Sequence, residues 1–205
     1  MSSSISPEET ALILIGFQND YFAPNGILRD VIEASSKVTK LLENTEQLIG
    51  AIADLPMPII ATPIIFAENY SELDNEPVGI LRTIKEVGAF QAGKTGSETI
   101  PELLKFGDRI VYIQGKHGLN AFSNTELEHY LKAKNIKNIA IAGTVTSICV
   151  DSTARCATEL GFNTIVLSDC TSSRTIFEQE FYCRHIFPIY STVLDHTSFI
   201  ASLRA

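Results

Sequence analysis

The sequence predicts an α/β protein in which helices cover both faces of a parallel β-sheet. Short, continuous apolar segments recur along the chain, as is typical of strands that are buried on both faces. Amphipathic segments of helical length lie between them, and this alternation is the pattern of βαβ units. A length of 205 residues fits one domain, which we expect to extend over residues 1–205.

The strands are expected where apolar segments are bounded by turn residues. The segments ALILIG and PIIATPIIF carry no charged residue, and RIVYI, NIAIAG and NTIVLSD follow at similar intervals. A weaker sixth segment, PIYSTV, comes near the C-terminus. In chain order, the predicted strands cover residues 11–16, 58–66, 109–113, 138–143, 163–169 and 188–193.

Six amphipathic segments are predicted as helices. Thr146 or Ser147 can cap the start of one helix, and Gly161 suits the position just after its end. Ser123 is expected to cap another helix. The predicted helices cover residues 34–54, 98–104, 123–134, 147–160, 173–185 and 195–203.

Two long connections depart from this alternation, at residues 16–33 and 67–97. In an open α/β sheet the ligand site lies beyond the carboxyl ends of the strands. We therefore expect both connections to line that site. The aromatic candidates for a pocket there are Phe17, Phe66, Tyr70, Phe90 and Phe122.

Composition and charge exclude several classes of partner. Hydrophobic residues make up 45% and charged residues 20% of the chain, which indicates a packed globular protein. A formal net charge of −8 and the lack of a basic run argue against nucleic acid. The first strand is followed by GFQNDY and no GxGxxG occurs, which excludes a Rossmann dinucleotide site. The N-terminus does not resemble a signal peptide and no segment has the length of a membrane span, so we expect a cytoplasmic protein without a membrane partner.

The cysteines and histidines are not spaced like metal ligands or a disulfide framework. The chain has no CxxC, HxH or HxxxH pattern. We therefore expect no protein-built metal site and no cofactor. The four cysteines, which lie in the last third of the chain, are Cys149, Cys156, Cys170 and Cys183.

Cys149 is placed as a catalytic nucleophile would be placed. It is predicted in the first turn of the helix that follows the strand ending at Gly143, where the helix dipole and free N–H groups favour a thiolate. Free cysteines more often pack as small hydrophobic residues, and this interpretation is favoured for the other three. For Cys149, position alone leaves both interpretations open.

Lys116 is a second candidate for a functional role. It follows the strand at 109–113 and is flanked by Gly115 and Gly118, so it can come close to the mouth of the site. Most lysines are solvated surface residues, and this position alone does not distinguish the two roles.

Three motifs extend over nearly the whole chain: ALILIGFQNDYF, KxxxxAFxxTxLExxL and AGTVTSICVDSTARCATELGFNTIVLSD. Together they resemble the isochorismatase-like cysteine hydrolases, a superfamily that includes nicotinamidases, N-carbamoylsarcosine amidases and isochorismatases. The resemblance implies a three-layer α/β/α sandwich with a six-stranded parallel sheet of Rossmann-like topology, and a homodimer or homotetramer. It also implies that Cys149 is the nucleophile and Lys116 its cationic partner.

The resemblance further implies a cis peptide bond between Thr144 and Val145. The N–H groups of Val145 and Cys149 would then form an oxyanion hole.

The chain departs from the family pattern in two places. Family members usually read IDxQND, whereas this chain reads IGFQND, which places Gly16 where the catalytic aspartate is expected. The alternatives for the missing acid are Asp20, Glu68 and Glu86. Nicotinamidases carry a DxH metal motif after the second strand, but the corresponding stretch TPIIFAENYSELDNEP has no histidine, so a metal ion is not favoured.

The leading hypothesis is a metal-independent cysteine hydrolase that cleaves an amide or ureido-type C–N bond of a small molecule through a thioester on Cys149. One alternative is vinyl-ether hydrolysis of the isochorismate type, which needs a strong acid. The other is a catalytically silent protein that binds a small molecule, and Gly16 is its main support.

Overall fold

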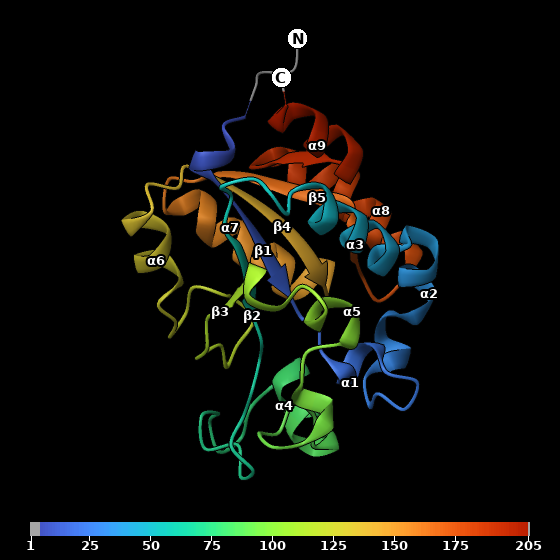
Figure 1. Ribbon diagram of the computed structural model, residues 1–205. Helices are drawn as coiled ribbons and strands as arrows, with labels where there is room; N and C mark the ends of the chain where they lie inside the picture. The colour runs from blue at the N-terminus through green and yellow to red at the C-terminus, as the bar shows by residue number, and fades with distance from the viewer. Residues whose placement is uncertain (1–4, 205) are drawn as a thin grey trace.

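The computed structural model describes residues 5–204, and within them a six-stranded parallel sheet lies between two layers of helices (Figure 1). The strand order is β3-β2-β1-β4-β5-β6. This architecture confirms the predicted α/β/α sandwich. The strands are β1 (Thr10–Ile15), β2 (Ile59–Thr62), β3 (Ile110–Tyr112), β4 (Asn138–Thr144), β5 (Asn163–Ser172) and β6 (Thr192–Leu194).

The central strand β1 shows why continuous apolar segments form this sheet. All of its residues are buried. Leu12 and Leu14 belong to the core on one face, whereas Ile13 and Ile15 belong to the core on the other. Because successive side chains of a strand point to opposite faces, a strand that is covered on both sides needs apolar residues at every position.

The helices divide between the two faces of the sheet. Apolar residues of α3, α5 and α9 pack in one core, and those of α6 and α7 pack in the other. The helices of the described residues are α1 (Asn19–Phe22), α2 (Arg29–Thr39), α3 (Leu41–Ala51), α4 (Gly79–Val87), α5 (Pro101–Leu104), α6 (Leu127–Ala133), α7 (Asp151–Glu159), α8 (Ile176–Phe181) and α9 (His196–Leu203).

Several predicted boundaries are wrong. The predicted helix 34–54 is two helices, α2 and α3, because Lys40 adopts a left-handed conformation with a φ of 54° between them. The helix expected from residue 123 begins at Leu127, and its N-cap is Glu126 rather than Ser123. The predicted position of Gly161 is confirmed, since it follows the last residues of α7 with a φ of +89°.

Both long connections contain a helix that was not predicted. The short helix α1 lies in the segment after β1, and α4 lies in the segment after β2. In Figure 1, α4 lies beyond the carboxyl ends of the central strands, apart from the two main helix layers. These connections are therefore structured walls rather than plain loops.

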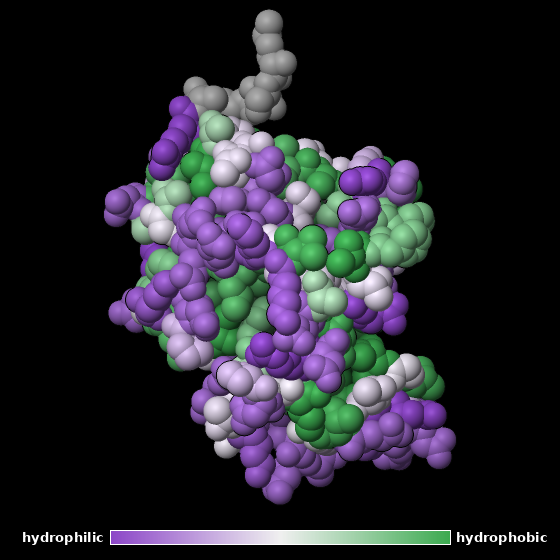
Figure 2. All heavy atoms as spheres, turned by 90° about the vertical axis from the view of Figure 1, so that its right-hand side faces the viewer, coloured by the Kyte–Doolittle hydropathy of each residue, from purple (hydrophilic) through white to green (hydrophobic). Residues whose placement is uncertain are grey.

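The surface does not present a single extended apolar area on the side that Figure 2 shows. Apolar side chains there are interrupted by polar ones. Within residues 5–204, no helix combines the length and hydrophobicity needed to cross a bilayer.

The strand order reverses direction between β1 and β4, which are adjacent and parallel. Connections on the two sides of such a switch point leave toward opposite faces, so a crevice opens at the carboxyl ends of these two strands. The fold thus predicts where a ligand would bind.

The Asp195 side chain caps the N-terminus of α9, and the contribution of this cap to stability can be measured. Its Oδ1 accepts a hydrogen bond from the Ser198 N–H at 2.7 Å. Hydrogen bonds from the Thr197 hydroxyl and the Ser198 N–H lower the pKa of Asp195 to about 2. We predict that Asp195→Ala lowers the free energy of unfolding by about 1 kcal/mol at pH 7, measured by urea denaturation.

The pH dependence of this loss follows from the direction of the shift. A carboxylate with a lowered pKa stabilises the fold above its ordinary value of 3.8, and this contribution is lost as the pH falls toward about 2. The difference between parent and Asp195→Ala should therefore shrink from pH 7 to pH 3. Asp195→Asn keeps an acceptor oxygen and should lose less. Equal stabilities of parent and Asp195→Ala at pH 7 would contradict the capping role.

Candidate active site

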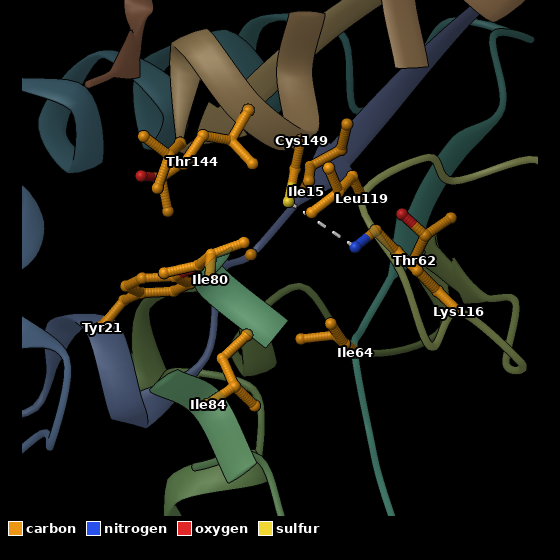
Figure 3. A pocket seen from close by; sticks show the side chains of 13 residues that line it. Ile15, Tyr21, Thr62, Ile64, Ile80, Ile84, Lys116, Leu119, Thr144 and Cys149 are labelled. Atoms are coloured by element: carbon orange, nitrogen blue, oxygen red, sulfur yellow. Dashed lines mark hydrogen bonds between the residues drawn. The ribbon is translucent and has the colours of Figure 1, made fainter. Parts of the chain in front are cut away.

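A small cavity opens at the carboxyl ends of β1, β2 and β4, where the topology predicts a ligand site (Figure 3). No aspartate, glutamate or histidine is among the described residues that line it. Its polar side chains are those of Cys149, Lys116, Tyr21, Thr62 and Thr144. Much of its wall is aliphatic, formed by Ile15, Ile64, Ile80, Ile84, Leu119, Val145 and Ile148.

Cys149 and Lys116 meet in this cavity. The Lys116 Nζ lies 3.8 Å from the Cys149 Sγ, and Figure 3 shows the two side chains pointing toward each other. Both are buried, with Cys149 9% and Lys116 1% exposed. The lysine ammonium also donates a hydrogen bond to the Gly118 carbonyl. The contact places the hydrogen-bond donor of a buried lysine directly on the cysteine sulfur.

Backbone elements hold these two side chains from opposite sides. Cys149 lies in a π-helical turn, Thr146–Val150, that connects β4 to α7. Lys116 follows β3, and an isolated parallel bridge to Ile64 fixes its backbone against the segment after β2. The structure thus brings together two residues that are 33 positions apart in the sequence.

Thr146 or Ser147 was expected to cap a helix. Instead, Thr146 contacts α8 and Ser147 contacts the segment that precedes α8. The Thr146 hydroxyl donates to the Gln179 Oε1, and the Gln179 Nε2 in turn donates to the Ser168 carbonyl at 2.9 Å. The Ser173 hydroxyl lies 3.2 Å from the Ser147 hydroxyl. The turn that carries Cys149 is thus attached to α8 through Thr146 and to the residue after β5 through Ser147.

The peptide bond between Thr144 and Val145 is cis, as the resemblance implies. Val145 lines the cavity and is 1% exposed. Its N–H has no acceptor among residues 5–204. An unpaired buried donor at a cavity wall is suited to bind an oxyanion. The participation of the Val145 and Cys149 N–H groups in an oxyanion hole stays a prediction.

Gly16 has a conformation that excludes an ordinary side chain. Its φ is +72°, and a Cβ built on it would lie 2.6 Å from the Thr144 carbonyl oxygen. The position that the resemblance assigns to the family acid is therefore closed to an aspartate in this backbone.

The three alternative acids do not line the cavity. The Asp20 Oδ2 accepts a hydrogen bond from the Phe90 N–H at 2.6 Å, so this carboxylate ties α1 to the segment after β2. Glu68 and Glu86 are exposed. None of the three takes the place of the missing acid in this structure.

The expected aromatic lining is wrong, because the large rings fill the protein core instead. Phe66, Tyr70 and Phe90 belong to a buried cluster beside the cavity. Phe122 stacks on Phe162, and Phe17 stacks on Phe22 at a centroid distance of 5.8 Å.

Several side chains of the cavity were missed in the sequence, among them Tyr21, Thr62, Ile80 and Ile84. Tyr21 directly follows the QND motif, and Thr62 ends the apolar run of β2. Ile80 and Ile84 are four residues apart on α4, a spacing that places both on one helix face. Burial, with further effects of Cys149 and Asp20, raises the pKa of Tyr21, so its hydroxyl stays protonated at neutral pH.

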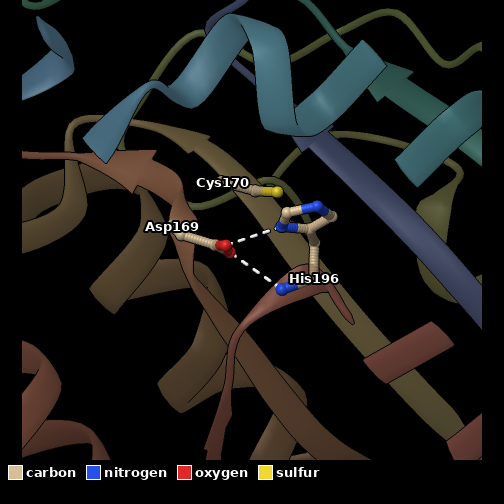
Figure 4. Close-up of side chains that lie close together, drawn as sticks. All are labelled: Asp169, Cys170 and His196. Carbon is tan, nitrogen blue, oxygen red and sulfur yellow. Dashed lines mark hydrogen bonds and ion pairs between the residues drawn. The ribbon is translucent and has the colours of Figure 1, made fainter. Parts of the chain in front are cut away.

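One group of potential metal ligands occurs among the described residues, away from this cavity (Figure 4). It consists of Asp169, Cys170 and His196, which the sequence spacing did not reveal. The Asp169 carboxylate accepts the His196 backbone N–H at 2.8 Å and contacts its ring Nδ1 at 2.6 Å. Burial raises the pKa of the Cys170 thiol, which disfavours the thiolate that binds metals. The hydrogen bonds explain this group as an anchor between β5 and the start of α9.

A cysteine and a lysine in a cavity at the switch point of a six-stranded parallel sheet define the class of protein. Residues 10–198 match the isochorismatase domain. The chain belongs to the isochorismatase family.

Individual relatives agree with this assignment. The chain is 26% identical to the ureidoacrylate amidohydrolase RutB of Cronobacter sakazakii, over 98% of this chain and 90% of that protein. A cysteine hydrolase from Pseudomonas syringae has the same fold, with a TM-score of 0.82 at 20% identity over 98% of this chain and 95% of that one. The N-carbamoylsarcosine amidase of Thermoplasma acidophilum superposes with a TM-score of 0.71 at 20% identity, over 92% and 96% of the two chains.

The conformation of Gly16 leads to a stability prediction. Gly16→Ala should lower the free energy of unfolding in two ways. A left-handed non-glycine residue costs about 1 kcal/mol, and the contact with the Thr144 carbonyl costs roughly a further 1–3 kcal/mol. Gly88→Ala is the matched control, since Gly88 has a φ of +74° and no atom within 4 Å of a built Cβ. Denaturant unfolding measures both. Equal losses at the two positions would show that the close approach to Thr144 is absent.

The four thiols should differ in reactivity at pH 7. Burial raises the pKa of Cys183 to about 12 and also raises that of Cys170, so both remain neutral and unreactive. We predict that iodoacetamide alkylates Cys149 first in a Cys156→Ala background, which removes the remaining half-buried thiol. Peptide mass spectrometry over time gives the rate at each site.

The same assay tests the contact with Lys116. In the Cys156→Ala background, Lys116→Met should slow alkylation of Cys149 about tenfold, because the neighbouring ammonium is lost. Circular dichroism verifies that the variant is folded. An unchanged rate, or labelling of Cys183 as fast as that of Cys149, would refute the assignment of Cys149 as the activated thiol.

Proposed function

We propose that this protein is a hydrolase that cleaves an amide or ureido-type C–N bond of a small molecule, with Cys149 as the nucleophile. The observation that carries the proposal is the 3.8 Å approach of the Lys116 Nζ to the Cys149 Sγ inside a cavity at the switch point of the sheet. A cysteine activated in this way is suited to attack a carbonyl carbon.

The residues of the cavity can complete both halves of such a reaction. The Cys149 thiolate attacks the carbonyl carbon, and the oxyanion accepts hydrogen bonds from the N–H groups of Val145 and Cys149. When the C–N bond breaks, the leaving nitrogen takes a proton from the Lys116 ammonium. The products of this step are the amine or ammonia, a thioester and a neutral lysine.

Hydrolysis of the thioester restores the starting state. Water transfers a proton to the neutral Lys116 and attacks the thioester carbonyl. Collapse of the second tetrahedral intermediate breaks the C–S bond and releases the carboxylic or carbamic acid. Cys149 is then a thiolate again and Lys116 an ammonium, so no protein carboxylate is needed.

The relatives support the type of bond. RutB is an amidohydrolase that acts on ureidoacrylate, and N-carbamoylsarcosine amidase is named for another ureido compound. Vinyl-ether hydrolysis needs a strong acid, and no carboxylic acid lines the cavity among the described residues. The geometry therefore favours C–N cleavage.

The remaining expectations about partners and metals stay predictions. We propose a small molecule as the substrate and a homodimer or homotetramer as the assembly.

The proposed steps use no metal ion, so incubation with EDTA should leave turnover unchanged.

A screen of small amides and ureides tests the proposal. We predict that released ammonia or amine is detected for at least one compound, and that mass spectrometry finds an acyl adduct on Cys149. Cys149→Ala should abolish turnover and adduct, because the nucleophile is lost while alanine suits a helical turn.

Cys156→Ala is the control for this experiment, since it removes a thiol that does not line the cavity. It should keep parental turnover. Full activity of Cys149→Ala would overturn the nucleophile assignment. A protein that binds compounds but forms no adduct with any of them would be a catalytically silent member of the family.

A further inference from the structure

Thr62 has a buried hydroxyl that no protein group satisfies. The residue is 1% exposed, lies at the end of β2 and lines the cavity. Its Oγ1 has no hydrogen-bond partner among residues 5–204. A buried polar atom without a partner is unfavourable, so its presence at a cavity wall indicates a ligand group that satisfies it.

The other polar groups of the cavity limit what that ligand group can be. Lys116 and the Val145 N–H are donors, and donors satisfy the carbonyl oxygen of an amide. The N–H groups of an amide or ureide instead need an acceptor. The Thr144 hydroxyl donates to the Ser172 carbonyl, which holds it toward the end of β5. Thr62 lines the same cavity as Cys149 and Lys116, and its Oγ1 is an acceptor without a partner among residues 5–204 (Figure 3).

The rest of the wall indicates the charge of the substrate. Aliphatic side chains from α4 and from the turn carrying Cys149 dominate it, including Ile80, Ile84 and Ile148. Lys116 is the one lysine or arginine among the described lining residues. Its Nζ already donates hydrogen bonds to the Cys149 sulfur and the Gly118 carbonyl. A carboxylate on the substrate would be buried without a cationic partner, which is strongly unfavourable.

We infer that the substrate is a neutral, aliphatic primary amide or monosubstituted urea, and that the Thr62 hydroxyl binds its amide or ureido nitrogen. This inference rests on the proposed function and narrows it. It separates this chain from its ureidoacrylate-cleaving relatives, whose substrate carries a carboxylate in addition to the ureido group.

Two pairs of nearly isosteric compounds test the charge preference. The first pair is 4-methylpentanamide and succinamate, and the second is isobutylurea and N-carbamoylglycine. Within each pair an isopropyl group replaces a carboxylate. We predict that kcat/KM is about 100-fold or more higher for the neutral member, because the carboxylate would have to be desolvated in an aliphatic cavity.

Binding to Cys149→Ala, measured by calorimetry, separates this inference from the proposed function. The neutral members should bind and the charged ones should not. Turnover and a Cys149 adduct with the charged members preferred would overturn the inference and leave the hydrolase proposal intact. Selective binding of the neutral members without an adduct in the parent would support the inference and refute the hydrolase. Absence of binding by all four compounds would overturn the inference.

Substitutions of Thr62 test the hydrogen bond. Thr62→Val keeps the shape and should lower kcat/KM for the preferred neutral compound about tenfold, chiefly through KM. Thr62→Ser restores the hydroxyl and should recover most of the loss. Parental kinetics of Thr62→Val, or a loss that Thr62→Ser does not rescue, would refute the role of the hydroxyl.

Thr45 provides a matched control. It is fully buried, and its hydroxyl also has no partner among the described residues, but it lies in α3 and does not line the cavity. Thr45→Val should therefore leave kcat and KM unchanged. A comparable loss of kcat/KM in Thr45→Val would assign the effect of Thr62→Val to core packing rather than to substrate binding.

Discussion

The close approach of the ends of β1 and β4 is the constraint on which the site depends. A side chain at Gly143 would overlap the Ile15 carbonyl, and a Cβ at Gly16 would lie 2.6 Å from the Thr144 carbonyl oxygen. Two neighbouring strands can come so close at the switch point only because neither carries a side chain there. The chain therefore leaves β4 directly into the turn that carries Cys149, while β1 leads into α1. Both sides of the cavity begin at this contact.

The same contact explains how the site differs from the pattern that the family motif predicts. The Thr144 carbonyl occupies the position toward which a side chain of residue 16 would point. Lys116 consequently contacts Cys149 in the cavity, and no protein carboxylate is among the described lining residues. A buried lysine in contact with a sulfur is tolerable because its hydrogen bonds to that sulfur and to the Gly118 carbonyl replace those to water.

The sequence was sufficient for features that depend on local pattern and insufficient for those that depend on packing at a distance. Continuous apolar segments identified the strands. The positions of Cys149 and Lys116 after strands made them candidates, and the resemblance of the motifs to a known family singled them out as the pair that meets. The amphipathic spacing of Ile80 and Ile84 could have revealed α4, but glycine, proline and acidic residues around it favoured a loop. Tyr70 and Phe90 were expected in the pocket because they lie in a long connection, yet their size makes them the best filling for the cluster under that connection. Whether the Thr62 hydroxyl finds a hydrogen-bond partner depends on residues from several elements, so the local sequence could not reveal that it has none among the described residues.

The QND part of the first motif has a structural role that is independent of the missing acid. The Gln18 side chain donates to the Ile64 and Ser97 carbonyls, both at 2.8 Å, and accepts the Ile64 N–H at 3.0 Å. Asp20 holds the Phe90 N–H in the same way. Together they attach the segment after β2, including α4, to the end of β1, and so build the aliphatic wall of the cavity. These contacts do not involve residue 16. Gln18 and Asp20 can therefore keep their structural role while the residue at the position of the family acid changes. A match to this motif therefore identifies the framework of the site, whereas the reaction has to be inferred from the groups that face the cavity.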